Sequence, residues 1–348
     1  MSDGADDRRS SRRAAIATCA VRLRRALSRT VRPHPDLPAH AAALSSAYRS
    51  GESAAHPAGH IHDPASAHAY AAARMPATFA AIARALAETA DRMPDFRPGS
   101  LLDVGAGTGA ATWAATTVWP TLVELNLVDR EPAAIDLGRR LAAVSGSAVL
   151  ARAHWQRADL GGVPGVDQTA ADVVTAAYVL NELPAPTAAA VVVRLWAATR
   201  GVLVIVEPGS RAGFERIRAA RDALIGAGGH VAAPCPGDAT CPISGAVWCH
   251  FLARLERSPL QRGAKAAERS WEDEPFSFVA VSRVATAPAP RVVLGRPRQR
   301  PGLIELRVCV DGRIERRLLS RRHGDAYRTA RDLAWGDVVP AGVLDVAD

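Results

Sequence analysis

The sequence predicts an α/β protein built on a doubly wound, mostly parallel sheet. An apolar strand at residues 101–104 runs into a turn with glycine at every second position, and an alanine-rich helix follows at once. Beyond this turn, short apolar stretches alternate with helical patterns, and a polar residue stands at the end of each stretch. Such alternation places the strands side by side in parallel, with a ligand crevice at their carboxyl ends.

Five segments are expected in chain order. Residues 1–38 form a basic arm that ends in prolines and is either flexible or a helix that forms on contact. Residues 39–98 form a helical lead-in, because apolar side chains recur there at helical spacing. Residues 99–230 form the core around the sheet. Residues 231–340 hold the remaining strands, a group of cysteines and a basic region, and residues 341–348 form a tail.

Within the core, the strands after the glycine turn are predicted at residues 122–128, 149–158, 172–180 and 202–206. Helices are predicted between them at residues 135–144 and 187–199. This order returns the chain to the same edge of the sheet after every strand. The polar residues at the strand ends are therefore expected to meet in one crevice.

The glycine turn itself predicts a nucleotide cofactor. Gly105, Gly107 and Gly109 lack a β-carbon, so a ligand can approach the backbone closely, and the next helix begins with unpaired N–H groups. Asp129, after the second strand, can accept hydrogen bonds from ribose hydroxyls. Asp159, after the third, can accept one from an adenine amine.

Asp103 bears on the identity of this cofactor, since an acidic residue inside the first strand is unusual for a dinucleotide-binding protein. It suits a cofactor with a cationic amino-acid end. The acidic residue two positions before GxGxG resembles the first motif of the class I S-adenosylmethionine-dependent methyltransferases, whose sheet is Rossmann-like. NAD(P) remains the alternative, because Gly105, Gly107 and Ala110 satisfy the looser dinucleotide pattern.

Asn181 and Glu182 are the candidate catalytic residues, because they follow the fourth strand. Many amino-methylating enzymes carry Asn or Asp, two prolines and an aromatic residue at this point; here the second proline and the aromatic are missing. Asn181 or Glu182 would orient or deprotonate the acceptor, with help from Glu207. The alternative is that the segment only starts a helix.

Four cysteines form the most specific pattern: Cys235, Cys241, Cys249 and, further on, Cys309. Four thiolates suit either a four-iron cluster or a tetrahedral zinc. The wide, irregular spacing and the absence of paired CxxC motifs favour iron and sulfur, with zinc or plain burial of the cysteines as alternatives.

Positive charge gathers at both ends of the chain, and residues 254–331 hold 18 Arg and Lys against 9 Asp and Glu. Arg254, Arg257, Arg262 and Lys265 follow helical spacing, and Arg296, Arg298 and Arg300 surround two prolines. This asymmetry predicts a nucleic-acid partner, bound by contact with its backbone and shape, unless the arginines are only solvated. No signal peptide or membrane span is expected, and the cysteine usage favours the cytoplasm.

Several segments together resemble one family, the methyltransferase-like assembly factors of the mitochondrial small ribosomal subunit and their bacterial relatives. The segments are RMPATFAAI, LLDVGAGTGAATWA, VLNELP, VIVEPGS, APCPGDATCP, WCHF, RLERSPLQR, FSFVAVSR and RVCVDGRIERR. The resemblance covers about residues 40–340. It implies a class I methyltransferase fold that binds S-adenosylmethionine and a [4Fe-4S] cluster on Cys235, Cys241, Cys249 and Cys309. It also implies contact with small-subunit ribosomal RNA, with no membrane or DNA partner.

The resemblance leaves two functions open. The first is an assembly factor that binds RNA and cofactor with little or no turnover, and the second is an active ribosomal RNA methyltransferase. The incomplete motif at Asn181 favours the first.

Overall fold

The computed structural model describes residues 3–31, 34–50, 61, 63–159, 169–245, 247–286 and 291–345. Parts of the predicted arm and tail lie outside these ranges. Four helices precede the sheet: α1 (Asp3–Thr30), α2 (Leu37–Ser50), α3 (Pro64–Ala73) and α4 (Met75–Arg92).

The central sheet has the strand order β3-β2-β1-β4-β5-β8-β6, and β7 pairs with the outer part of β8. Its strands are β1 (Ser100–Val104), β2 (Glu124–Asp129), β3 (His154–Arg157), β4 (Ala171–Ala177), β5 (Thr199–Pro208), β6 (His230–Ala233), β7 (Phe251–Glu256) and β8 (Trp271–Ser282). β1 to β5 are mutually parallel, whereas β8 runs antiparallel to β5, β6 and β7. The predicted α/β class with a mostly parallel sheet is confirmed.

The remaining helices of the core connect these strands. They are α5 (Ala110–Val118), α6 (Pro132–Ala143), α7 (Ala148–Ala151), α8 (Ala185–Ala197), α9 (Arg211–Gly226) and α10 (Pro259–Lys265), with a 3-10 turn, η3 (Leu180–Glu182). The strand expected at 149–158 is shorter than predicted, because α7 occupies its first residues. Likewise, the fourth strand ends at Ala177 and η3 follows it.

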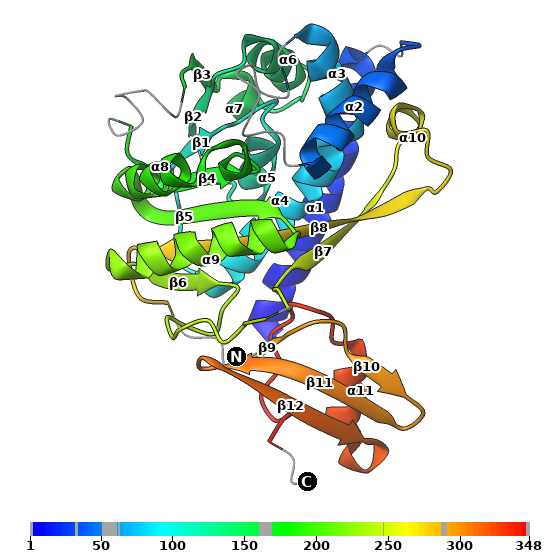
Figure 1. Ribbon diagram of the computed structural model, residues 1–348, viewed down its shortest axis with the longest axis vertical. Helices are drawn as coiled ribbons and strands as arrows, with labels where there is room; N and C mark the ends of the chain where they lie inside the picture. Colours follow the sequence, from blue (N-terminus) through cyan, green and yellow to red (C-terminus); the bar gives the residue numbers. More distant parts are fainter. Residues whose placement is uncertain are drawn as a thin grey trace.

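Side chains alternate across the buried strands and so create two apolar layers. Along β5, Val202, Val204 and Val206 face the layer that contains α1, α4 and α5, while Leu203 and Ile205 face the layer of α8 and α9. Figure 1 shows α8 and α9 on the near side of the sheet and the N-terminal helices on the far side. Burial on both faces explains why these strands are continuously apolar in the sequence.

The segment expected to be a flexible arm forms helix α1 over Asp3–Thr30. Cys19, Leu23 and Leu27 lie on one stripe of this helix and are buried against the core. Arg9 and Arg12 lie one turn apart and both pair with Asp91 on α4. The arginines that suggested an arm thus accompany a buried apolar stripe, which holds the helix on the core.

A smaller module follows the central sheet. It contains β9 (Val292–Val293), β10 (Arg298–Arg300), β11 (Leu303–Val310), β12 (Arg313–Ser320), η4 (Arg321–His323) and α11 (Gly324–Asp332). Its separate core includes Leu306, Val308, Leu319 and Ala330. In Figure 1 this module lies beneath the central sheet, near the N-terminal end of α1. Among the described residues, no helix is both long and apolar enough to cross a membrane.

Candidate functional site

The glycine turn joins β1 to α5 in a conformation that needs glycine. Gly105, Gly107 and Gly109 all have positive φ angles, at 68°, 54° and 90°. A β-carbon on Gly105 would stand 2.5 Å from Val179 Cγ2, whereas one on Gly107 would meet no atom within 4 Å. Gly105 is therefore required by packing, and Gly107 faces open space.

Asp129 closes this turn from the end of β2. Its Oδ2 accepts a hydrogen bond from the Gly107 N–H at 2.7 Å, and its Oδ1 accepts one from the Glu131 N–H at 2.9 Å. Burial raises the pKa of Asp129, although these backbone donors oppose the shift. The carboxylate thus fixes the turn while it lines the adjoining cavity.

Asp103 is almost fully buried, so its carboxylate is less accessible than that of a residue that contacts a bound ligand directly. Its Oδ1 accepts from the Thr175 hydroxyl at 2.8 Å and its Oδ2 from the Thr112 hydroxyl at 2.7 Å. Burial raises the pKa of Asp103 to about 6. Asp103 therefore joins β1 to α5 and β4, and it reaches the cavity only at its margin.

A single cavity of about 670 Å³ lies over the carboxyl ends of the parallel strands. Gly105, Gly107, Asp103, Asp129 and Asp159 line one side of it. All the predicted cofactor residues except Gly109 thus meet there. Gly109 instead packs against Trp155, to which its β-carbon would come within 3.2 Å.

The other side of the cavity contains Asn181 and Glu182, which η3 places at its wall. Asn181 Oδ1 is buried and has no donor among the described residues. Burial raises the pKa of Glu182 to about 7, while the nearby Arg130 opposes the shift. The two candidate catalytic residues therefore face the same space as the glycine turn, with one free acceptor and one poised carboxyl group.

Glu207 has a supporting position instead. It is fully buried at the end of β5, where Oε1 accepts from the Leu180 N–H at 3.1 Å and Oε2 lies 3.4 Å from Arg216 Nη1. Burial raises the pKa of Glu207 to about 8, with Arg216 acting in the opposite direction. Its role in this structure is to hold η3, and it does not line the cavity.

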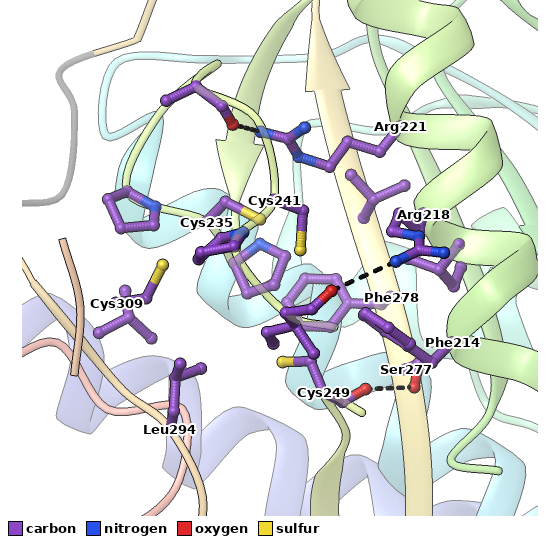
Figure 2. Close-up of a pocket in the computed structure, with 18 of the residues that line it drawn as sticks. Phe214, Arg218, Arg221, Cys235, Cys241, Cys249, Ser277, Phe278, Leu294 and Cys309 are labelled. Carbon is purple, nitrogen blue, oxygen red and sulfur yellow. Dashed lines mark hydrogen bonds between the residues drawn. The ribbon is translucent and has the colours of Figure 1, made fainter. Parts of the chain in front are cut away.

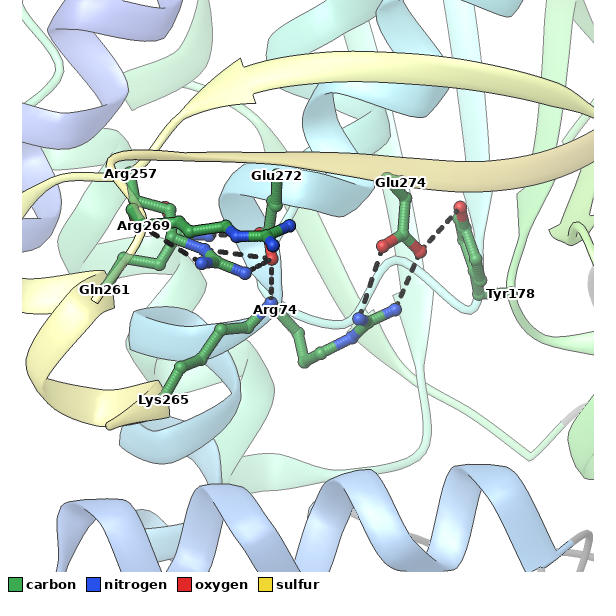
Figure 3. A network of polar contacts seen from close by, with 8 residues as sticks. All are labelled: Arg74, Tyr178, Arg257, Gln261, Lys265, Arg269, Glu272 and Glu274. Atoms are coloured by element: carbon green, nitrogen blue, oxygen red, sulfur yellow. Dashed lines mark hydrogen bonds and ion pairs between the residues drawn. The ribbon is translucent and has the colours of Figure 1, made fainter. Parts of the chain in front are cut away.

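Residues distant in the sequence complete the cavity. Arg74, between α3 and α4, donates two hydrogen bonds to Glu274 of β8, and the Tyr178 hydroxyl donates to the same carboxylate at 3.5 Å (Figure 3). Tyr178 has a φ angle of 58°, a strained value for an aromatic residue. No short motif marks this trio, because 200 positions separate Arg74 from Glu274.

Arg257 and Lys265, which were expected to contact RNA, belong to a neighbouring cluster around Glu272 (Figure 3). Arg257, Gln261 and Lys265 all donate to Glu272, two positions before Glu274 on β8. The helical spacing expected from Arg254 to Lys265 is also interrupted, since Arg254 lies on β7 and α10 starts at Pro259. Arg257 and Lys265 are therefore engaged in holding α10 to β8.

The four cysteines of the distinctive pattern gather around one small cavity of about 60 Å³ (Figure 2). Cys235 and Cys241 come from the loop after β6, Cys249 precedes β7, and Cys309 lies on β11 of the smaller module. Burial, together with the neighbouring cysteines, raises the pKa of Cys235 and raises that of Cys309 to about 12, while Arg221 opposes both shifts. These thiols are therefore protonated unless a cation compensates their charge.

Two arginines of α9 shape the cysteine loop. Arg221 Nη2 donates to the carbonyl oxygens of Gly237 and Ala239, and Arg218 Nη1 donates to that of Ile243. On the opposite side, the Ser277 hydroxyl of β8 donates to the Cys249 carbonyl at 2.8 Å. The loop is thus attached to both α9 and β8.

The four cysteines have the side chain that binds a metal as a thiolate, and all four line one cavity. Within the described part of the chain, however, no three His, Cys, Asp or Glu side chains are close enough to hold a single metal ion. A zinc ion needs all its sulfur ligands at about 2.3 Å. The structure therefore brings the cysteines to one place without assembling a zinc site.

A family comparison decides what kind of protein this is, since the model of one family, described as "Mitochondrial small ribosomal subunit Rsm22", matches residues 64–340. The chain belongs to this family. The match includes the glycine turn, the cysteines and most of the smaller module, so the resemblance inferred from the sequence is confirmed.

Two kinds of curated relative agree with this assignment. The human "Ribosome assembly protein METTL17, mitochondrial" is 35% identical over 294 residues, which cover 78% of this chain and 62% of the relative. The "Rsm22-cox11 tandem protein 2, mitochondrial" of Schizosaccharomyces pombe is 26% identical, covering 69% of this chain and 38% of the relative. The chain thus spans less than two thirds of the length of either.

These descriptions overturn the cytoplasmic location expected from the sequence, because the family and both relatives are described as mitochondrial. The expectation relied on reduced cysteines and the lack of a secretory signal peptide. Neither feature separates the cytosol from the inside of a mitochondrion.

Solved structures with similar folds include methyltransferases. The magnesium protoporphyrin IX methyltransferase of Synechocystis PCC 6803 with bound SAM is 13% identical, with 72% of this chain and 99% of that chain covered and a TM-score of 0.39. A precorrin-6y C5,15-methyltransferase from Geobacter metallireducens is also 13% identical, with coverages of 58% and 85% and a TM-score of 0.36.

The buried carboxyl group of Glu207 predicts a pH-dependent stability. Its pKa of about 8 in the folded protein lies above the ordinary value of about 4.3, so the folded state binds a proton that the unfolded state has released. Stability should therefore fall as pH rises from about 5 to 8. Each unit of pKa difference contributes about 1.4 kcal/mol to this loss.

Urea unfolding of the wild type and Glu207→Gln between pH 5 and 8 tests this, because the amide cannot ionise. The variant should show a smaller fall in unfolding free energy, and Glu182→Gln should reduce the fall by less, because the pKa of Glu182 is raised only to about 7. Parallel pH profiles for the wild type and Glu207→Gln would contradict the assignment.

Proposed function

We propose that this protein assists assembly of the small ribosomal subunit by binding its RNA, and that it also binds S-adenosylmethionine with little or no methyl transfer. The family match carries this proposal, since it spans the core and the smaller module together. The name of the human relative supports the assembly role.

S-adenosylmethionine is proposed for the cavity at the glycine turn. Gly107 leaves room there, and Asp129 and Asp159 supply acceptors for hydroxyl and amine groups. The volume of about 670 Å³ lies within the range of about 300–1,000 Å³ common for ligand pockets. NAD(P) is the alternative, and it is distinguished by direct titration of both ligands.

Slow or absent turnover is proposed because the segment after β4 lacks the second proline and the aromatic residue that many amino-methylating enzymes carry there. Asn181 Oδ1 still offers an unused acceptor to an N–H group, and Glu182 could take a proton. These two residues are the argument for the alternative, an active ribosomal RNA methyltransferase. Mapping methylated nucleotides of small-subunit RNA with and without the protein separates the two functions.

The smaller module is the proposed main RNA contact. Strand register places Arg298 and Arg300 of β10 opposite Glu305 and Leu303 of β11, and places Arg307 opposite Arg316 of β12. These four arginines lie on exposed positions, whereas Leu306 and Val308 form the core on the opposite face. Guanidinium groups on a folded sheet suit recognition of phosphate groups and shape.

A [4Fe-4S] cluster on Cys235, Cys241, Cys249 and Cys309 is proposed to hold this module to the core, with zinc as the alternative. Support comes from the gathering of four thiols from both parts of the molecule around one cavity. The wide, irregular spacing of these cysteines in the sequence and the absence of paired CxxC motifs favour the cluster over zinc. The role is structural.

The cofactor proposal predicts that Gly107→Ala weakens S-adenosylmethionine binding at least tenfold, about 1.4 kcal/mol, because its methyl group projects into the cavity. Gly146→Ala is the matched control: Gly146 also has a positive φ and open space around a β-carbon, but it does not line the cavity. Each change should cost about 1 kcal/mol of stability. Calorimetric titration that gives equal affinities for both variants would refute the site.

The RNA proposal predicts that Arg298→Glu with Arg300→Glu lowers the affinity for small-subunit RNA and flattens its salt dependence. Each lost phosphate contact should reduce the slope of log affinity against log salt by about 0.7 to 0.9. Arg152→Glu with Arg211→Glu changes the net charge equally at exposed positions elsewhere. Filter-binding titrations with the same loss in both double variants would show a general charge effect and no contact at β10.

The cluster proposal predicts that Cys309→Ser lowers bound iron, exposes residues 259–322 to protease and weakens RNA binding, while S-adenosylmethionine binding changes less. The loop between Cys249 and Cys309 is long, and metal coordination would help to offset its closure entropy. Cys19→Ser is the control, since Cys19 is buried on α1 away from the cavity. Full iron content and protease resistance in Cys309→Ser would contradict the fourth ligand.

A further inference from the structure

A second large hollow lies away from the cofactor cavity. It is a groove of about 790 Å³ between α1, α4, β7 and residues 334–338, which follow α11. Arg84 of α4 is one of the residues that line it, and this side chain donates to the carbonyl oxygens of Leu252 and Trp335. The core and the smaller module thus form this groove together.

Helix α1 presents a second apolar stripe to the groove. Its first stripe, with Cys19 and Leu23, is buried in the core. Ile16, Ala17, Ala20 and Val21 line the groove, and Val21 remains 37% exposed. Ile16 and Ala20 also pack against the core, so Ala17 and Val21 are the apolar side chains of this stripe that are available to a partner.

Basic side chains surround this apolar floor. Seven arginines and four carboxylates line the groove. The arginines at the ends of α1 are partly engaged, Arg9 with Asp91 and Arg24 with Glu256. Among the described residues, Arg13 and Arg92 have no carboxylate within ion-pair distance, so the groove has an excess of positive charge.

We infer that this groove binds an acidic, amphipathic segment of a protein partner. Aliphatic side chains of that segment pack on Ala17 and Val21, and its carboxylates pair with Arg13 and Arg92. From Arg9 to Arg24 the groove follows α1 for about 22 Å, the length of a helix of about 15 residues. This binding mode is that of an amphipathic helix in a groove, with charge at the rim setting its specificity.

The floor of the groove favours a peptide over RNA. The only aromatic side chain among its lining residues is Phe79, which is 2% exposed and offers no face for base stacking. The arginines of the groove suit phosphate groups as well as carboxylates, but its aliphatic floor at Ala17 and Val21 matches the apolar face of a peptide and offers no stacking surface to a base. This inference does not depend on the RNA site proposed for β10 to β12.

Fluorescence anisotropy with a labelled 15-residue peptide tests the inference on the full chain. The probe carries leucine and alanine on one helical face and glutamate on the other; its counterpart has lysine in place of glutamate. The acidic probe should bind at least about tenfold more tightly than the basic one. Arg13→Glu should weaken it about fivefold, the effect of one exposed ion pair, and Arg13→Lys should retain binding.

Val21→Asp tests the floor, and Val193→Asp is its control, because Val193 is an exposed valine on α8 outside the groove. Only Val21→Asp should lower peptide affinity, and Arg298→Glu with Arg300→Glu should leave it unchanged. Equal affinity for both probes, or displacement of the acidic probe by small-subunit RNA, would overturn the inference. Loss of RNA binding in the β10 variants alone would bear on the RNA proposal only.

Discussion

The antiparallel pairing of β8 with β5 is the constraint on which the other features depend. Residues 276–282 of β8 pair with β5 and are all buried, and residues 280–282 also pair with β6 on their other side. Nearer the start of the same strand, Glu272 binds Lys265 of α10, and Glu274 binds Arg74 at the wall of the cavity over the glycine turn. Ser277 of this strand donates a hydrogen bond to the carbonyl oxygen of Cys249 and so holds the segment before β7. One strand therefore fixes the positions of both proposed ligand sites.

Local patterns were sufficient to predict the parallel half of this sheet. Alternating apolar strands and helices identify β1 to β5, and the GxGxG turn requires the positive φ angles that glycine adopts. The same patterns extended the third strand over α7, because four apolar residues can form a short helix or a strand equally well. They also missed the docking of α1, whose arginines outweighed its single buried stripe.

The candidate cofactor residues were predictable where consecutive parallel strands bring their carboxyl ends together. Gly107 and Asp129 satisfy this, because the carboxyl ends of β1 and β2 adjoin. The pairing of Arg74 with Glu274 does not, because it depends on where α3 and β8 meet. For the same reason, composition assigned Arg257 and Lys265 to a nucleic acid, although both are occupied by Glu272.

The position of Cys309 also has a consequence for how the protein is made. Three of the four cysteines around this cavity leave the ribosome before β7, and Cys309 follows only after β8 and β10 have been synthesised. Since domains generally fold in order of their emergence, the sheet and its cavity can form while the fourth wall of the cysteine cavity is still missing. A truncated chain would keep a folded core and lack that wall. Only a chain that has been synthesised through β11 can therefore complete the cysteine cavity.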